Sequence, residues 1–220
     1  MEQKSKLLLL SKMKYTDLLA NSNDFNSKSL LTKKSIEKME RIISDSSYFS
    51  FMEKVNGGFF YDYSLQIYSI DTSFEFHNIM KINEVIKKEY GRIINEDFFF
   101  GQEILGNQYG YSKAGIVFFN AETGEREKIA NNFDEWIDVL KSDLDYLTGK
   151  NVAKSWNISN VSLKADERLY PKKPFVIGGE FKIENLFPLR YPKYIAAYAN
   201  IANQIYNLPD GTKITLKITE

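Results

Sequence analysis

The sequence predicts an α+β fold with a strand-rich middle and helices on either side. Short apolar runs of strand length, Phe98-Phe99-Phe100 and residues 116–119, are separated by a stretch punctuated with glycines. Apolar residues recur at helical spacing before these runs, from residue 35, and after them, from residue 132. The chain has 220 residues, 15% of them aromatic, which is enough to bury a substantial core.

The first part of the chain is predicted to be helical. Residues 1–34 are rich in Lys, Ser, Asn and Leu and are interpreted as a helical arm. A helix is then predicted from Ser35, and Asn56-Gly57-Gly58 ends it because Asn and Gly adopt the left-handed conformation at least cost. Its apolar face consists of Ile36, Met39, Ile43, Phe51, Met52 and Val55.

Two strands and a short helix are predicted next. Residues 59–64 and 65–68 are rich in aromatic side chains that partly alternate, which indicates strands. Asn78 is a suitable N-cap for a helix, and Gly91 lies just beyond its expected end.

A hairpin and the clearest helix of the chain follow. The turn signal at residues 121–124 predicts a hairpin between residues 116–119 and 125–129. Asn132, with Glu135 three residues later, resembles a capping box. The helix that it opens is expected to continue to Gly149, because its apolar stripe runs through Phe133, Trp136, Ile137, Leu140, Leu144 and Leu147.

Residues 150–220 are predicted to form a C-terminal extension of mixed helix and strand. Prolines at 171, 174 and 188 interrupt regular structure. A last helix is predicted from Pro192, and residues 208–211 read Leu-Pro-Asp-Gly, a tight turn. A strand with one solvent-exposed face is expected after this turn, because Ile214, Leu216 and Ile218 alternate with polar residues.

Catalytic and metal-binding chemistry is scarce. The chain has no Cys and one histidine, His77, which excludes thiolate sites and two-histidine metal sites, so we expect no metal and no cofactor. His77 adjoins a helix start, where a capping or surface role is expected. Glu96, Asp97 and Glu103 form the best candidate acid–base cluster, but among 29 acidic residues a chance grouping is the simpler interpretation.

The charge of the chain is unevenly distributed. Residues 56–147 contain 16 Asp and Glu against 8 Lys and Arg, whereas both ends are basic and the whole is neutral. This pattern favours a surface that attracts a basic partner, with an ordinary solvated acidic face as the alternative. It disfavours direct nucleic-acid binding. No signal peptide and no apolar stretch approaching ~20 residues is present, so we expect a cytoplasmic protein without a membrane span.

Several motifs together resemble one family. Asn56-Gly57-Gly58 follows a helix, Phe-Gly-Gln-Glu at residues 100–103 precedes Gly-Asn-Gln-Tyr at 106–109, and Glu-Thr-Gly-Glu at 122–125 precedes the helix that contains Trp136. This succession resembles the SUKH superfamily, which includes yeast cell-wall synthesis regulators and many bacterial immunity proteins.

The resemblance implies a central, mainly antiparallel sheet flanked by helices and no enzymatic activity. We expect an N-terminal arm at residues 1–34, a SUKH-like domain at 35–149 and an extension at 150–220 packed on it. The extension resembles that of longer bacterial members, which carry Pro-Phe-Val-x-Gly-Gly and Leu-Pro-Asp-Gly stretches. Bacterial members typically neutralise a toxin, often a nuclease or deaminase, within polymorphic toxin systems.

The sequence also suggests which residues have structural roles and which contact a partner. Turn and core roles are expected for Asn56, Gly57, Gly58, Gly106, Asn107 and Trp136. Partner contacts are expected among aromatic and acidic side chains of the sheet and its loops, because together they supply anchoring area and charge complementarity. The candidates are Tyr61, Asp62, Tyr63, Glu96, Asp97, Glu103, Tyr109 and Tyr111, of which strand alternation should bury about half.

Three functions are therefore considered. The first is a cytoplasmic immunity protein that binds and blocks one cognate, basic toxin. The second is an intracellular scaffold or regulatory binding module. The third is a hydrolase that uses Glu96, Asp97 or Glu103, which requires two of these carboxyl groups to face each other in a cleft.

Overall fold

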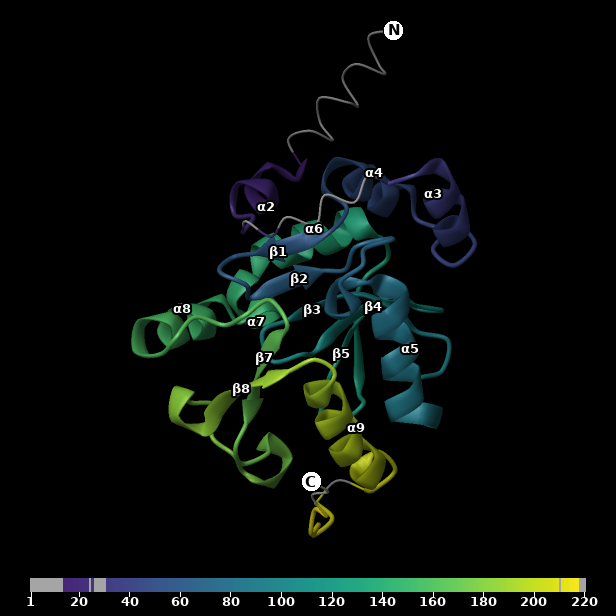
Figure 1. The fold of residues 1–220 in the computed structure, drawn as a ribbon. Helices are drawn as coiled ribbons and strands as arrows, with labels where there is room; N and C mark the ends of the chain where they lie inside the picture. The colour runs from purple at the N-terminus through teal and green to yellow at the C-terminus, as the bar shows by residue number, and fades with distance from the viewer. Residues whose placement is uncertain (1–13, 24, 26–30, 210, 218–220) are drawn as a thin grey trace, which may run out of the picture.

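The centre of the molecule is an antiparallel sheet in which each strand pairs with the next along the chain (Figure 1). The computed structural model describes residues 14–23, 25, 31–209 and 211–217. Within them the sheet has six strands: β1 (Gly58–Phe60), β2 (Leu65–Ile67), β3 (Phe98–Glu103), β4 (Gln108–Ser112), β5 (Gly115–Phe119) and β6 (Arg126–Ala130). The predicted α+β class and the antiparallel sheet are thus confirmed.

Helices cover both faces of this sheet (Figure 1). In chain order the described helices are α2 (Thr16–Ala20), α3 (Lys33–Glu40), α4 (Ser46–Val55), α5 (Ile79–Tyr90), α6 (Phe133–Ser142), α7 (Leu144–Thr148), α8 (Lys150–Ser159) and α9 (Lys193–Ile205). Short 3₁₀ turns lie at Glu75–His77, Gly91–Ile93, Phe175–Ile177 and Ile183–Asn185. A second, two-stranded sheet pairs β7 (Glu167–Pro171) with β8 (Leu186–Arg190).

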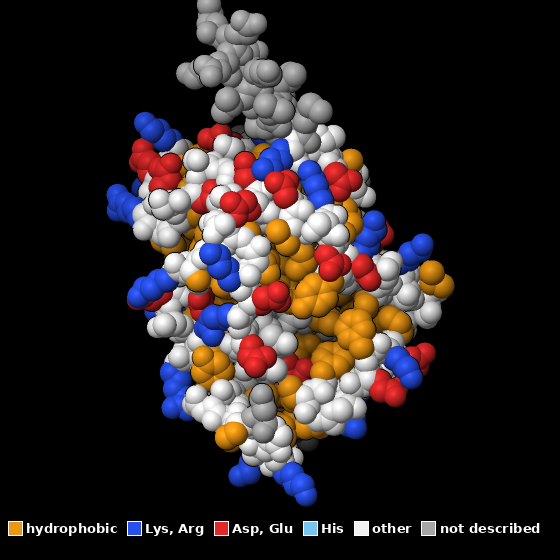
Figure 2. All heavy atoms as spheres, turned by 180° about the vertical axis from the view of Figure 1, so that it is seen from behind, with side chains coloured by type: hydrophobic (Ala, Val, Ile, Leu, Met, Phe, Trp, Pro, Cys, Tyr) orange, Lys and Arg blue, Asp and Glu red, His pale blue; other side chains and the backbone are white. Residues whose placement is uncertain are grey.

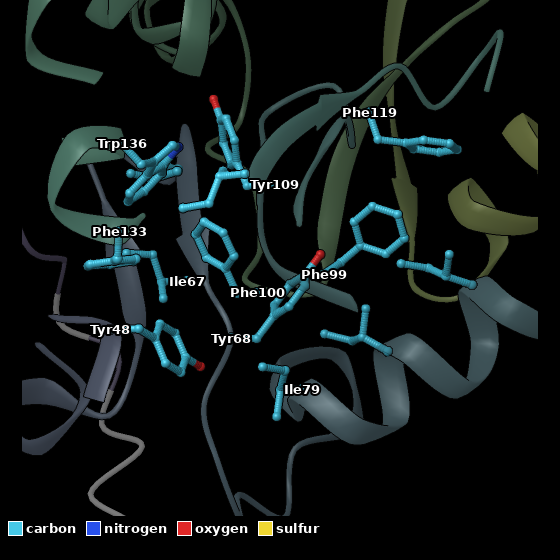
Figure 3. Close-up of a cluster of buried hydrophobic side chains, with 14 of the residues drawn as sticks. Tyr48, Ile67, Tyr68, Ile79, Phe99, Phe100, Tyr109, Phe119, Phe133 and Trp136 are labelled. Atoms are coloured by element: carbon cyan, nitrogen blue, oxygen red, sulfur yellow. The ribbon is translucent and has the colours of Figure 1, made fainter. Parts of the chain in front are cut away.

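The core has one aromatic layer on each side of the sheet, as Figure 3 shows. On one side, Trp136 of α6 packs edge-on against Phe100 of β3, with ring centroids 5.1 Å apart. On the other side, Tyr90 of α5 packs against Phe119 of β5 at 5.3 Å. Phe99, which precedes Phe100 in β3, also packs against Phe119, with ring centroids 5.3 Å apart. Neighbouring residues of β3 therefore belong to opposite layers, because the side chains of a strand alternate between its faces.

The predicted helix over residues 35–55 is in fact two helices. Residues 41–45 separate α3 from α4, and the Asp45 carboxylate accepts hydrogen bonds from the backbone N–H groups of Ser47 (3.0 Å) and Tyr48 (3.4 Å). Apolar spacing alone could not reveal this break, but Asp45 is a strong N-cap residue.

The predicted helix after Asn132 is also divided. Its start is confirmed, since the Asn132 side chain accepts a hydrogen bond from the Glu135 N–H at 3.0 Å. Asp143, with φ −140°, leaves helical geometry and caps α7. Gly149 then ends α7 in the left-handed conformation.

The strand predicted at residues 59–64 stops at Phe60. Tyr61, Asp62 and Tyr63 all have positive φ values, of 52°, 57° and 67°, and form the turn to β2. The N-terminal segment supports this turn: Tyr61 N–H donates to the Asn21 carbonyl oxygen at 2.9 Å, and Tyr63 N–H donates to the Asn23 side chain at 3.2 Å. The contact between Tyr63 and Asn23, which are 40 residues apart in sequence, thus overrides the strand propensity of the aromatic residues.

The C-terminal extension contacts the main core through α9. Tyr194 and Tyr198 are buried in the same cluster as the sheet residues. The predicted helix from Pro192 is confirmed, whereas the strand predicted around Ile214 is wrong for residues 213–217, which pair with no strand. The Gln204 side chain of α9 instead hydrogen-bonds the Lys217 backbone. Ile218 lies outside the described residues.

Candidate partner-binding cleft

A cleft of about 640 Å³ lies at the end of the sheet where the β3–β4 and β5–β6 turns meet the extension. We call it the acidic cleft, because it is lined by four carboxylates and by no Lys or Arg among the described residues. The carboxylates are those of Glu103, Glu122, Asp143 and Asp145. Its aromatic walls are Phe118, Tyr146, Phe175, Phe181 and Tyr198.

Glu103 lies at the end of β3 and is only 3% exposed. Its carboxylate accepts hydrogen bonds from the backbone N–H groups of Leu105 (3.0 Å) and Asn107 (2.8 Å), so it holds the β3–β4 turn closed. Burial raises its pKa to about 7, although these bonds and the charge of Arg168 act in the opposite direction. Ionisation of Glu103 is therefore less favourable in the folded protein than in water.

Glu122 comes from the β5–β6 turn and is 4% exposed. Its carboxylate accepts a hydrogen bond from the Val176 N–H at 3.3 Å, which ties this turn to the loop between β7 and β8. Burial raises the pKa of Glu122 to about 7 as well. The acidic cleft thus contains two carboxyl groups that change charge near neutral pH.

The mouth of the cleft combines exposed charge with exposed aromatic surface. Asp143 and Asp145 are exposed and accept backbone hydrogen bonds from Tyr146 N–H (3.4 Å) and Asn151 N–H (2.7 Å). Tyr146 and Phe181 are 62% and 61% exposed. Figure 2 shows the face opposite to that of Figure 1, where an apolar patch is bordered by acidic side chains.

A row of glutamines lies deeper in the molecule. Gln66, Gln102 and Gln108 are register partners on β2, β3 and β4, and their amides contact one another at 2.7 and 3.0 Å. We call them the amide row. Arg168 of β7 and Tyr194 of α9 cover it, and both contact its side chains. Through these two contacts the amide row joins the extension to the sheet. Because the row is fully buried, it offers no surface to a partner.

His77 belongs to the same interior, contrary to the expected capping or surface role. Its ring nitrogens lie 2.9 Å from the Gln66 amide and 2.6 Å from the Ser69 hydroxyl. Burial and the nearby Arg168 charge lower the pKa of His77 to about 3, so the ring is neutral at physiological pH. The ring is completely buried, so a substrate has no access to this Ser–His pair.

The predicted contact residues do not form one surface. Glu103 lines the acidic cleft, whereas Tyr109 is fully buried, with its hydroxyl donating to the Leu147 carbonyl oxygen. Tyr61 is buried and donates to Asp17, while Asp62 and Tyr63 extend the same β1–β2 turn.

The remaining candidates lie near the opposite end of β3. Glu96 is exposed and pairs with Lys113 at 3.0 Å, while Asp97 pairs with Arg126 at 2.6 Å. Tyr111 donates a hydrogen bond to Asp45 at 2.9 Å.

Glu103 does not pair with either of the other two candidate hydrolase carboxylates. Glu96 and Asp97 precede β3 and Glu103 ends it, so the length of a strand, about 17 Å, separates Glu103 from both. Glu103 is therefore too distant to act with Glu96 or Asp97 in two-carboxylate hydrolysis. No group of three His, Cys, Asp or Glu among the described residues could hold a metal ion.

The motif residues have local structural explanations. Asn56 adopts the left-handed conformation (φ 40°), and its side chain exchanges two 2.9 Å hydrogen bonds with the Ile70 backbone. Next to it, a Cβ atom on Gly57 would lie 2.5 Å from the Ile67 carbonyl oxygen. The chain can therefore pass β2 this closely only with glycine at position 57.

The second motif shapes the β3–β4 turn. Gly106 has a positive φ of 86° and lies against the Tyr194 ring of α9. Gly58, from the first motif, also has a positive φ, of 145°, at the start of β1. Asn107 accepts a hydrogen bond from the Ala121 N–H at 2.9 Å and so joins the two turns beside the cleft.

Sequence reasoning identified one of the four acids of the cleft. Glu122 lies in the predicted turn at residues 121–124, and Asp143 and Asp145 lie outside the apolar stripe of the helix predicted from Asn132 to Gly149. The sequence feature that could have pointed to Glu122 is the Glu-Thr-Gly-Glu motif. For Phe175 and Phe181 it is their occurrence as two aromatic residues in one glycine-containing loop of the extension. Nothing local indicated that these segments meet.

Comparisons with known proteins agree with this architecture. The model of the SMI1 / KNR4 family (SUKH-1) matches residues 31–139. The crystal structure of Atu4351 from Agrobacterium tumefaciens superposes with a TM-score of 0.60 at 15% sequence identity, covering 84% of this chain and 88% of that one. At this identity the likeness concerns the fold alone. No curated protein matches the sequence significantly. Among the described helices, none has the length and apolar character that crossing a membrane requires.

Proposed function

Through residues 31–139 the chain belongs to the SUKH superfamily, and from this premise we propose that it is a non-enzymatic immunity protein that binds and neutralises one bacterial toxin. Membership supports an immunity or regulatory role in general. The acidic cleft is the observation that favours a basic protein partner. Its carboxylates and exposed rings supply the charge and the anchoring surface that such an interface uses.

The mechanism is occlusion. A nuclease that acts on nucleic acid carries a positive substrate groove, and an acidic protein surface is complementary to that groove. Long-range attraction raises the rate of encounter, and aromatic side chains at the centre of the contact slow dissociation. Both effects favour stoichiometric capture in the cytoplasm, before the toxin reaches its substrate.

Co-expression tests the proposed function. The toxin encoded beside this gene is expressed in a bacterial host with and without the chain, and growth and complex formation are measured. We expect restored growth and a 1:1 complex that survives size-exclusion chromatography, whereas an unrelated toxin serves as the control. Absence of a neighbouring toxin that binds more tightly than about 1 μM overturns the proposal.

A regulatory binding module is the second candidate, because the matching family model is that of the SMI1 / KNR4 proteins. The same acidic cleft would then bind basic segments of several host proteins. Affinity purification separates the two functions: several host partners indicate a regulatory module, and one small basic toxin indicates immunity.

A further inference from the structure

Among the described residues, no Lys or Arg side chain lines the acidic cleft. None of its four carboxylates forms an ion pair within the described part of the chain, although many acids elsewhere do. Basic residues close to these acids in sequence have other contacts. Lys141 donates to the Lys14 carbonyl oxygen at 2.7 Å, Arg126 pairs with Asp97, and Lys150 directs its ammonium over the Tyr61 ring at 5.3 Å. Arg168 favours the charged form of Glu103 from the buried side, where it covers the amide row, and it does not line the cleft. A cation inside the cleft itself must therefore come from another molecule.

Two of these carboxyl groups gain most from such a cation. Glu103 and Glu122 are almost fully buried, and their hydrogen bonds from backbone N–H groups do not cancel the cost of removing their charge from water. An incoming positive charge favours the ionised form of both. Asp143 and Asp145 at the mouth are exposed and attract the same cation from a distance.

The walls of the cleft distinguish one kind of cation from another. Tyr146 and Phe181 are both largely exposed residues and line the cleft together with the carboxylates. A guanidinium is planar and weakly hydrated, so it stacks on aromatic rings while it hydrogen-bonds carboxylates in pairs. A lysine ammonium is compact and strongly hydrated, and it gains less from such walls. The volume of about 640 Å³ leaves ample room for an arginine side chain.

We infer that the acidic cleft receives an arginine side chain of the toxin, with the guanidinium facing its carboxylates and the aromatic rings packed against the guanidinium plane and alkyl chain. This inference rests on the proposed function for the identity of the partner. The cleft itself is defined by this chain alone, so its chemistry is testable without the toxin.

The probe is the peptide acetyl-Gly-Arg-Gly-amide, titrated into the full chain at pH 8, where Glu103 and Glu122 are ionised. Amide resonances are followed by ¹⁵N–¹H NMR. We expect saturable shifts of Glu122, Asp145 and Tyr146 in the millimolar range. The neutral isostere with citrulline in place of arginine should not produce them, and the lysine peptide should bind several-fold more weakly.

Variants make the result specific. The double variant Glu122→Gln/Asp145→Asn should weaken binding of the arginine peptide about tenfold, because charge-assisted hydrogen bonds are lost while both backbone donors keep an acceptor. Glu53→Gln, an exposed acid on α4 away from the cleft, is the matched control and should bind like the wild type. A dispersed NMR spectrum verifies that each variant is folded.

The outcomes separate the two proposals. Equal binding of the arginine and citrulline peptides, equal binding of the lysine peptide, or shifts located elsewhere overturn the arginine site, even if the chain neutralises its toxin. Conversely, specific binding of the arginine peptide with no toxin neutralised supports the site and contradicts the immunity function.

Discussion

The Arg168 guanidinium of β7 donates a hydrogen bond to the Gln66 side-chain oxygen of β2, across 102 residues of sequence. Arg168 is buried and also lies over the Phe59 ring, 5.6 Å from its centroid. No carboxylate lies within ion-pair distance of it among the described residues, so amides, a ring and the Glu167 carbonyl oxygen solvate its charge. The contact fastens the extension to the sheet.

Truncating Arg168 should loosen this attachment. We expect Arg168→Ala to destabilise the protein by about 3 kcal/mol, since it leaves a cavity and removes hydrogen bonds. Arg168→Met keeps most of the volume and removes the cost of a buried charge, so it should cost clearly less, about 1 kcal/mol. Urea unfolding measures both. If the two variants are equally unstable, the charge itself holds the extension and packing does not.

The Trp136 ring is the largest fully buried side chain, packed between Phe100, Tyr109 and Phe133. We expect Trp136→Ala to cost about 3–5 kcal/mol, because it opens a large cavity. Its indole N–H has no hydrogen-bond partner among the described residues, so Trp136→Phe should cost much less. A thermal melt of Trp136→Ala that matches the wild type would show that the stripe of α6 is not core.

The stability of the protein should depend on pH through Glu122. Its pKa is raised from 4.5 to about 7, so the folded protein binds more protons than the unfolded chain between these values. Stability therefore falls as pH rises through this window and is constant above it.

Glu122→Gln should remove on the order of 2 kcal/mol of this loss. The variant should then be more stable than the wild type at pH 8 and similar at pH 4.5. Urea denaturation at the two pH values gives the comparison, with Glu53→Gln as control. Parallel profiles for Glu122→Gln and wild type would contradict the burial of a charged Glu122.

The turn at Tyr61-Asp62-Tyr63 should tolerate glycine better than a branched side chain. Asp62 is exposed and has φ 57°, where a Cβ atom is unfavourable and a β-branched residue is strained. We expect Asp62→Val to be about 1–2 kcal/mol less stable than Asp62→Gly, with Asp62→Ala between them. Identical melting temperatures for the three would show that the turn is not left-handed.

The mouth of the acidic cleft should govern the rate of toxin association. Asp143→Asn/Asp145→Asn keeps acceptors for the backbone donors but removes two charges. Association should slow several-fold at low salt and become less sensitive to salt, whereas dissociation changes less. Stopped-flow kinetics at two ionic strengths measure this. Unchanged association rates would remove the argument for electrostatic attraction by these two residues.

The elements that sequence predicted well are those with local signals. Asn132 with Glu135, and Pro192 ahead of α9, set helix starts through residues a few positions apart. The same local rules missed the break at Asp45, since apolar spacing continued across it. Periodicity reports which face is buried, and it does not report whether the backbone between two buried residues is helical.

The candidate site was less predictable because its parts are distant in sequence. Glu122 and Val176 are 54 residues apart, and their contact depends on how the extension returns to the sheet. His77 was misjudged for a different reason. Its partners Gln66 and Ser69 are only 11 and 8 residues away, but no local pattern shows that the segment around His77 folds back beside β2 and buries the ring.

The loop between β7 and β8 supplies one wall of the acidic cleft, while the turns of the central sheet supply its base. Substitutions in that loop can reshape the opening without disturbing the strands that keep the molecule folded. Under the proposed function, partner recognition and folding therefore depend on separate stretches of the chain. Changes at a few exposed positions of this loop would then alter which partner is bound and leave the scaffold the same.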